Sequence, residues 1–391
     1  MSRKSLLFLL LLLLFTQCTS TRKLLQAGEI AKADLTQPLA FDYYNKLLFV
    51  DVEVNGQPRR FIIDSGAPNV VDRRLKEELQ LQPVKKDKVT DSQNNHSELE
   101  FVTIESLAFA GVEARNSTAI VADLSLFHCL GIDGLLGANV MRHFDWEVDY
   151  QQQQARLYPK DGQQRWDTLY EIAMPFTVKT QGTPDLEVRA PGWWKAGGVT
   201  LDLGSTGGIS IHRSDKLQLP RDSSATFAFG QDSKGIYGAN TDTTFYILMD
   251  SLLLGGQLFQ PALVAASNTS NKIGNSFWEQ YKLLISWRDN RLYLSPREVI
   301  APQLPSDLLA LGFEDGAVLV LATYENLGRL NDQLEFGDVV IQVNGVDTEG
   351  ISVEDYCALR EQEWETLELK VRKKEGEALV GITLRKGEVE W

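Results

Sequence analysis

The sequence predicts a mainly β protein made of two similar halves, followed by a smaller third unit. Two observations predict the halves. Short apolar runs alternate with turn residues, and an apolar run that ends in Asp before a small-residue turn occurs twice. These turns begin at Asp64 and Asp202, which are 138 positions apart (202 − 64). Pro302 and Pro305 indicate a linker before the third unit.

The first half is predicted to consist of strands and hairpins. Residues 47–54 form an apolar run that reaches Asn55-Gly56, a strong hairpin signal, and the returning strand 59–64 ends at the first turn. Residues 131–141 are predicted to form a strand that leads into a short helix. A strand pair at 146–150 and 154–158 closes the half.

The second half repeats this order, and the repeat is stronger evidence than either Asp turn alone. Residues 209–212 follow the second turn as 70–71 follow the first, and the segment 272–277 resembles 136–141. The run 245–254 is predicted to form one long strand, equivalent to 101–109. A hairpin at 283–294 closes this half in the same way.

Two carboxylates brought face to face form an acid/base device. At a separation of about 3 Å they cannot both ionise, so they share a proton and titrate as a unit. One Asp-Ser-Gly turn is weak evidence, because Asp and Gly are common turn residues. The repeated surroundings of Asp64 and Asp202 are what make the pair informative.

These residues resemble the pepsin and retropepsin superfamily of aspartic proteases, as two small lobes fused in one chain. The segments 64–67 and 135–139 carry the resemblance in the first half, and 202–205 with 272–275 carry it less closely in the second. It implies bilobal acid-protease-like β-barrels, with lobes at 35–160 and 165–298. It also implies an endopeptidase in which Asp64 and Asp202 act on a shared water, without cofactor or metal, and a polypeptide substrate between the lobes.

The resemblance also assigns supporting roles around the two Asp residues. Gly66 and Gly204 would let the backbone approach the carboxylates, Ser65 would bond across to the opposite loop, and Ser205 would offer its hydroxyl to the second carboxylate. Leu203 stands where the second loop needs a hydroxyl. An alternative therefore remains open: a non-catalytic peptide-binding or scaffold protein that uses the same cleft.

Polar turns at 90–98 and 230–238 are the predicted flap tips, where Tyr237 is the aromatic side chain placed to reach a substrate. An ordinary exposed hairpin is the other interpretation of each turn.

The third unit, residues 303–391, resembles a PDZ domain. The run 334–345 matches the turn and hairpin of that family, and Leu311, Gly312 and Phe313 fit its carboxylate-binding loop. Ser352 is predicted to cap the helix that borders the peptide groove. The resemblance implies that a peptide or protein C-terminus binds in this groove.

Residues 1–18 have the pattern of an export signal. Arg3 and Lys4 precede an apolar run shorter than the roughly 20 residues that span a bilayer. Cys18 stands where bacterial lipoprotein signals place the lipidated Cys. Lipidation of Cys18, with anchoring to the membrane, and simple cleavage near Ser20 both remain open. Either way we expect an exported protein, periplasmic or a membrane-anchored lipoprotein of a Gram-negative bacterium.

Composition excludes several function classes. A formal net charge of −14 argues against a nucleic-acid partner. The four His residues are scattered without a ligand pattern, so no metal site is predicted. Cys129 and Cys357 are far apart in the sequence and are predicted to be buried free thiols.

Overall fold

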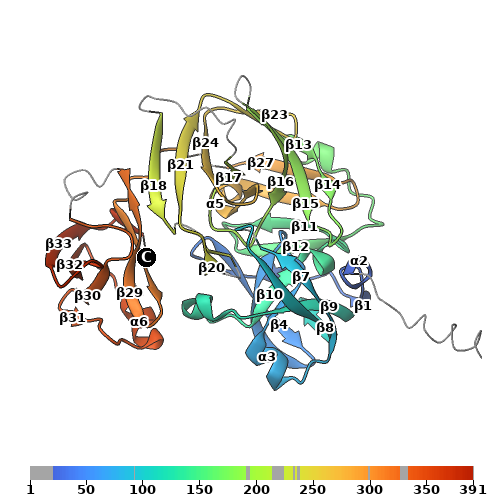
Figure 1. Cartoon of the computed structure of the whole chain (residues 1–391). Coiled ribbons are helices and arrows are strands. Elements are labelled where there is room, and N and C mark those ends of the chain that lie inside the picture. The colour runs from blue at the N-terminus through green and yellow to red at the C-terminus, as the bar shows by residue number, and fades with distance from the viewer. Residues whose placement is uncertain are drawn as a thin grey trace, which may run out of the picture.

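The computed structural model describes residues 21–91, 93–190, 194–213, 224–231, 234–235, 238–297, 300–325 and 333–390. The chain is mainly β, with several sheets, as the sequence predicts. In Figure 1 the first half (blue to teal) lies below the second (green to yellow), and the C-terminal unit (orange to red) stands beside them.

The first half is a nine-stranded sheet with β5 near its centre. Its order is β1-β9-β6-β10-β5-β4-β8-β7, and β3 pairs with β4. Asn55 and Gly56 form the β4–β5 turn with positive φ angles, as the hairpin signal predicts. The elements are α2 (Thr21–Leu24), β1 (Glu29–Ala33), β3 (Asp42–Tyr44), β4 (Leu47–Val54), β5 (Gln57–Asp64), β6 (Val70–Asp72), α3 (Arg73–Glu78), β7 (Pro83–Thr90), β8 (His96–Phe109), β9 (Val112–Ala122), η1 (Ser125–Leu130), β10 (Gly134–Gly137) and α4 (Ala138–Met141).

The second half repeats this architecture around β16. Residues 245–254, predicted as one strand, instead form the end of β21 and a separate β22, because the chain turns at 250–251. The elements are β14 (Thr177–Val178), β15 (Pro184–Ala190), β16 (Trp194–Leu201), β17 (Ile209–His212), β18 (Ala225–Gly230), β19 (Lys234–Gly235), β20 (Gly238–Ala239), β21 (Asp242–Met249), β22 (Leu252–Leu254), β23 (Gln257–Phe259), β24 (Ala262–Ser267), β25 (Lys272–Ile273) and α5 (Asn275–Trp278).

A six-stranded sheet joins the two halves, and it is built from their closing hairpins. Its order is β13-β27-β26-β11-β12-β2, with β11 of the first half paired to β26 of the second. Its strands are β2 (Leu39–Ala40), β11 (Phe144–Asp149), β12 (Gln154–Pro159), β13 (Ile172–Pro175), β26 (Tyr281–Ser286) and β27 (Arg291–Pro296), and η2 (Trp166–Thr168) lies in the connection between the halves.

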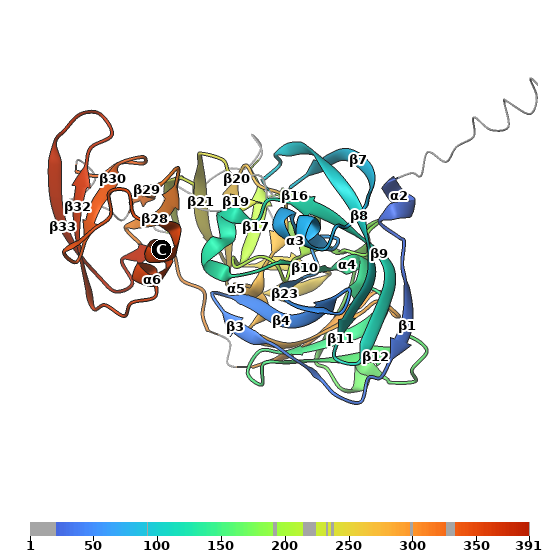
Figure 2. The same cartoon turned by 90° about the horizontal axis from the view of Figure 1, so that it is seen from below.

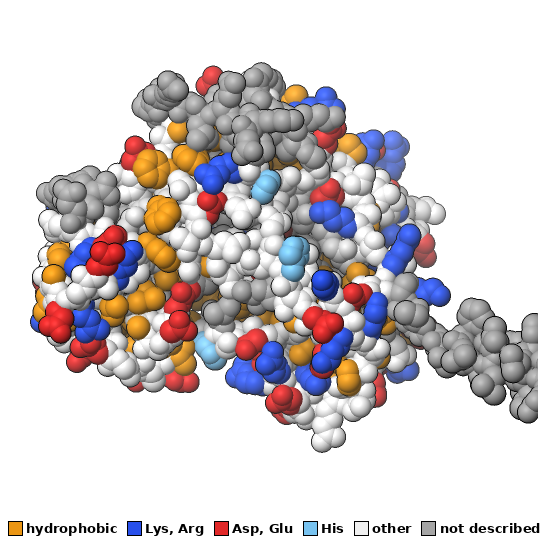
Figure 3. All heavy atoms as spheres, viewed as in Figure 1, with side chains coloured by type: hydrophobic (Ala, Val, Ile, Leu, Met, Phe, Trp, Pro, Cys, Tyr) orange, Lys and Arg blue, Asp and Glu red, His pale blue; other side chains and the backbone are white. Residues whose placement is uncertain are grey.

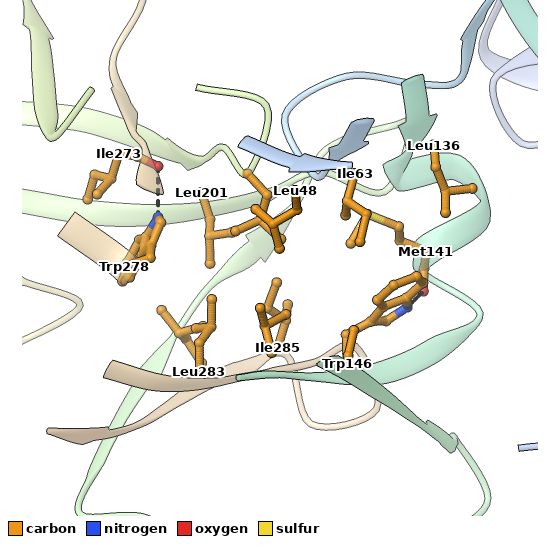
Figure 4. Close-up of a cluster of buried hydrophobic side chains, with 14 of the residues drawn as sticks. Leu48, Ile63, Leu136, Met141, Trp146, Leu201, Ile273, Trp278, Leu283 and Ile285 are labelled. Carbon is orange, nitrogen blue, oxygen red and sulfur yellow. Dashed lines mark hydrogen bonds between the residues drawn. The ribbon is translucent and has the colours of Figure 1, made fainter. Parts of the chain in front are cut away.

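The core shows the duplication in its side chains. Figure 4 shows buried residues from both halves above the joining sheet. Trp146 donates its indole proton to the carbonyl of Met141, and Trp278 donates in the same way to Ile273. All four side chains are fully buried, so the two halves share one hydrophobic core.

The C-terminal unit (residues 309–390) has a hydrophobic core of its own. Tyr356 and Leu359 of its helix pack with residues from its strands. Ser352 caps this helix, as predicted, by accepting from the Asp355 amide. The elements are β28 (Leu309–Glu314), β29 (Ala317–Tyr324), β30 (Val339–Val343), β31 (Val346–Asp347), α6 (Val353–Arg360), β32 (Thr366–Arg372), β33 (Leu379–Arg385) and β34 (Val389–Glu390).

The prediction that Leu311, Gly312 and Phe313 form a loop is wrong, because these residues lie inside β28. Asp315 and Gly316 both have positive φ angles and form a two-residue hairpin turn. The turn pairs residues 309–314 with β29, so the segment is drawn into a sheet.

The C-terminal unit is joined to both halves. Its strand β29 pairs antiparallel with β18 of the second half, so one sheet runs through both. In Figure 2 the C-terminal unit (orange to red) lies to one side of the two halves. A disulfide joins Cys129 of η1 to Cys357 of α6, with the Cα atoms 5.2 Å apart. The prediction of two free thiols is therefore wrong: their separation of 228 residues in the sequence hides a contact that only the tertiary fold creates.

Candidate active site

Asp64 ends β5, and the turn that follows binds its carboxylate. The Gly66 and Ala67 amides both donate to Asp64 Oδ1, at 2.7 and 3.0 Å. On one side β10 runs parallel to β5, with Gly137 opposite Asp64. Backbone amides that point at one oxygen fix the direction of the carboxyl group.

The segment behind this turn is packed too closely for larger residues. A Cβ on Gly137 would lie 2.1 Å from the Pro68 carbonyl carbon. Asn69 Oδ1 accepts from the Gly137 amide, and Asn139 Oδ1 accepts from the Asn69 amide, each at 2.8 Å. The apolar-apolar-Gly run therefore serves to hold the Asp64 turn in place.

Asp202 is held in the corresponding way in the second half. It follows β16, and the Gly204 amide donates to Asp202 Oδ1 at 3.0 Å. Ser205 contributes backbone bonds and, within the described residues, not the predicted hydroxyl bond to Asp202. Its amide donates to the Asp202 carbonyl at 3.2 Å, and its carbonyl accepts from the Asn275 amide at 2.8 Å. A Cβ on Gly274 would lie 2.4 Å from the Ser205 carbonyl oxygen, so this turn is also packed against a glycine.

The structure brings the two Asp residues together at the boundary between the halves. A Cβ on Gly66 would lie 2.7 Å from Asp202 Cγ, and a Cβ on Gly204 would lie 2.5 Å from Asp64 Cγ. Each carboxyl group thus packs on the glycine of the opposite turn. Only glycine at these two positions permits that contact.

Ser65 ties the two turns together. Its buried hydroxyl donates to the Leu201 carbonyl at 2.7 Å and accepts from the Leu203 amide at 3.1 Å. Leu203 is fully buried in the shared core, so the second turn contributes packing where the first contributes a hydroxyl. A single side chain from the first half therefore makes both of these bonds.

Burial perturbs both carboxyl groups. It is the largest cause that raises the pKa of Asp64, and the neighbouring Asp202 charge raises it further. Burial also raises the pKa of Asp202, while the positive charge of Lys272 and the Gly204 amide oppose this increase. Low-dielectric surroundings disfavour two charges in contact, so the pair retains a proton above the ordinary range for Asp.

The two hairpins that contain the predicted flap tips contact each other. The first is β7–β8, and the second is β18–β21 with β19 and β20 at its end. Asn240 Nδ2 donates to the Gln93 carbonyl at 2.7 Å, and a Cβ on Gly235 would lie 2.3 Å from Asp91 Oδ2. The two tips are therefore in contact. Tyr237, predicted to reach a substrate, lies outside the described residues, as does Cys18.

The sequence reasoning missed three contacts of the site. Thr183 Oγ1 donates to the Gly66 carbonyl at 3.3 Å. Asn275 Nδ2 donates to the Leu203 carbonyl at 2.8 Å, and Tyr150 OH donates to Asn275 Oδ1 at the same distance. Asn275 could have been predicted, because it occupies the position in the second half that Asn139 occupies in the first. Nothing in the sequence around Thr183 indicates its contact with Gly66.

Within the described residues, no three His, Cys, Asp or Glu side chains group as metal ligands do. In the same part of the chain, no helix is long and apolar enough to span a membrane.

Residues 50–140 match the family model for aspartyl proteases. The match contains the Asp64 turn and the segment packed behind it, and it supports a protease function with a polypeptide substrate. The chain is also similar to a solved retropepsin-like aspartic protease from Rickettsia conorii, at 17% identity and a TM-score of 0.25, over 34% of this chain and 94% of that one. Among curated proteins, none matches.

Proposed function

We propose that this chain is an aspartic endopeptidase whose dyad is Asp64 and Asp202. The observation that carries the proposal is the mutual packing of each carboxyl group on the glycine of the opposite turn. In this mechanism one carboxyl group is ionised and accepts a proton from a water molecule that attacks the peptide carbonyl. The other is protonated and donates to the oxyanion that forms.

The dyad's surroundings support this chemistry. Asp64 is 7% exposed, so nearly all of this residue is out of water. The backbone amides of Gly66 and Ala67 hold it without adding a counter-charge. A site of this kind keeps one proton without a metal or an organic group.

The test is hydrolysis of a denatured polypeptide by the Asp64→Asn and Asp202→Asn variants across pH 3–8. Each should lose cleavage, and wild-type activity should follow a bell-shaped pH profile and be blocked by a pepstatin-type inhibitor. Asp51→Asn is the matched control, because Asp51 is exposed on β4, and it should cleave normally. Undiminished activity in Asp64→Asn would overturn the assignment.

Leu203 favours one alternative, a peptide-binding or scaffold protein that grips a chain without cutting it. An apolar side chain there removes the reciprocal hydroxyl of the second turn. If wild-type protein binds a pepstatin-type inhibitor but leaves every denatured substrate intact, this alternative replaces the protease.

We also propose that the C-terminal unit is a PDZ-type module that binds polypeptide C-termini. One edge of β28 pairs with β29 along Leu311, Gly312 and Phe313. At these three residues no strand of the described chain pairs with the opposite edge of β28. An extended peptide could add to that edge. In the Asp64→Asn background, which prevents cleavage, a peptide with a free C-terminal carboxylate should bind more tightly than its amidated form. Equal binding would contradict this role.

Finally, we propose that the protein is exported. The Cys129–Cys357 disulfide supports an oxidising compartment, because such bonds are rare in the cytosol. Cell fractionation and the mass of the mature N-terminus test this proposal. A lipid on Cys18 that disappears in Cys18→Ser would support membrane anchoring, and cleavage near Ser20 without lipid would support a periplasmic form.

A further inference from the structure

The two halves differ in charge beside their Asp turns. In the first half Leu135 of β10 pairs with Ile62 and with Val70, and all three pack in an apolar cluster. In the second half Lys272 of β25 takes the place of Leu135. Its partners Thr200 and Ser210 correspond to Ile62 and Val70, so one apolar trio has become polar.

The register directs Lys272 toward Asp202. Lys272 lies opposite Thr200 in a parallel pair, and Thr200 is two residues before Asp202. Residues two apart share one face of a strand, so Thr200, Lys272 and Asp202 are on the same face. Adjacent strands lie about 4.8 Å apart and two residues advance about 6.6 Å, a span that a lysine side chain reaches.

Lys272 is a buried cation that makes no salt bridge within the described part of the chain. It is 8% exposed, and no carboxylate of the described residues lies within ion-pair distance of it. The other lysine that acts on Asp202 is Lys179, which is paired with Asp185 at 2.8 Å and donates to Thr200 Oγ1 at 2.7 Å. A buried ammonium without a partner is costly, so the charge of Lys272 favours a negative dyad beside it.

We propose that Lys272 is a positioning residue that places the negative charge of the dyad on Asp202 and the proton on Asp64. This inference rests on the proposed function, which it deepens by assigning the two roles. Asp202 then accepts the proton of the attacking water, and Asp64 donates to the oxyanion. Two identical carboxyl groups in symmetric surroundings would be equally able to accept and to donate the proton. Lys272 lies beside Asp202 alone, so the two carboxyl groups are no longer equivalent.

The electrostatics agree with this assignment. The groups that act on Asp202 are Asp64, Lys272 and Lys179, and Lys272 is the strongest of those that lower its pKa. The negative charge of Asp202 raises the pKa of Asp64 further, whereas the positive charges of Lys272 and Lys179 oppose the increase at Asp202.

The test uses an epoxide, 1,2-epoxy-3-(4-nitrophenoxy)propane, which reacts with ionised carboxylates. The carboxylate oxygen attacks an epoxide carbon, the ring C–O bond breaks, and the resulting alkoxide takes a proton from water to leave an ester. Peptide mapping by mass spectrometry then shows which Asp carries the label. This readout needs no turnover, so it stands even if the protein hydrolyses nothing.

In the wild type the ester should form on Asp202. Lys272→Arg keeps the charge and should preserve this pattern, whereas Lys272→Leu should lose the preference. The double variant Leu135→Lys/Lys272→Leu moves the charge to the first half and should move the label to Asp64. Circular dichroism confirms that each variant is folded.

The hydrolytic profile gives a second readout. In Lys272→Leu the acid limb of kcat/KM should move up by about 1–3 pH units, because Asp202 loses its nearby cation. The inference would be overturned by any of three results: a label on Asp64 in the wild type, no label on Asp202, or the same label pattern in Lys272→Leu and Lys272→Arg. A retained label pattern with no hydrolysis would overturn the proposed function alone.

Discussion

The Ser65 hydroxyl accepts a hydrogen bond from the Leu203 amide, across the boundary between the two halves. The same hydroxyl donates to the Leu201 carbonyl, so one side chain satisfies two buried backbone groups of the opposite turn. The position of Asp202 relative to Asp64 depends on these two bonds.

Ser65→Ala should therefore destabilise the protein and lower its activity. It leaves two buried backbone groups without partners, which costs about 1–3 kcal/mol per group. Thermal unfolding and kcat measure the effects. Ser65→Thr keeps the hydroxyl and is the matched control; if it and Ser65→Ala lose equal stability, the loss comes from packing and not from the bonds.

Asp64→Asn should be more stable than the wild type at neutral pH. The folded-state pKa of Asp64 is raised, so the wild type loses stability as pH rises above the unfolded value of about 3.9, by up to about 1.4 kcal/mol per pH unit for one proton. The amide side chain of the variant stays neutral, and its oxygen can still accept from the Gly66 and Ala67 amides.

The comparison of unfolding free energies at pH 4 and pH 7 checks this sign. The stability advantage of Asp64→Asn should be small at pH 4 and larger at pH 7. A stability difference that stays constant over this range would show that Asp64 ionises as freely in the folded protein as in the unfolded chain, and a wild type that gains stability relative to the variant would show that the pKa of Asp64 is lowered.

Loss of the disulfide should release the C-terminal unit from the first half. Reduction, or Cys129→Ser/Cys357→Ser, should lower stability by about 2–4 kcal/mol, because the bond restrains a long stretch of the unfolded chain. The melting temperature with and without a thiol reductant measures this. The double variant should not respond to reductant; a wild type that also ignores it would mean that the bond is absent.

Gly230 controls the junction between the second flap and the C-terminal unit. A Cβ there would lie 2.2 Å from the Leu321 oxygen, so Gly230→Ala should separate β18 from β29. Gly238→Ala is the matched control, since Gly238 also has a positive φ in this flap but faces open space. Hydrogen exchange should increase in 225–231 and 317–324 in Gly230→Ala only.

The rate of substrate cleavage tests whether this junction matters for activity. Because β29 extends the flap hairpin, a flap released by Gly230→Ala should cleave substrate more slowly than the Gly238→Ala flap. Equal rates in the two variants would show that the junction has no part in catalysis. Figure 3 shows hydrophobic side chains gathered over this junction, where Phe227 and Phe229 are exposed.

Much of this fold could be predicted because the two halves repeat the same order of apolar strand runs and Asp turns. Each of four features has a local cause in the sequence: the strand end at Asp64, the turn that follows β16 at Asp202, the hairpin turn at Asn55 and the helix cap at Ser352. The contact between the two Asp residues follows once the halves are paired.

What sequence reasoning missed depends on contacts that only folding creates. The Cys129–Cys357 bond joins two units, and the β18–β29 pairing brings together strands that lie about 90 residues apart, so neither strand's own sequence identifies its partner. Strand β1 is mostly exposed and starts before the predicted lobe, so no buried apolar alternation marks its pairing with β9. Lys272 is found only by the register that places it beside Thr200.

The proton shared by Asp64 and Asp202 is the central claim, and carbon NMR of protein labelled at Asp Cγ measures it most directly. Comparison with Asp64→Asn and Asp202→Asn assigns the two signals. The account predicts that both shift together and that the pair still holds one proton well above pH 4. Two carboxyl groups that each ionise independently near pH 4 would contradict it.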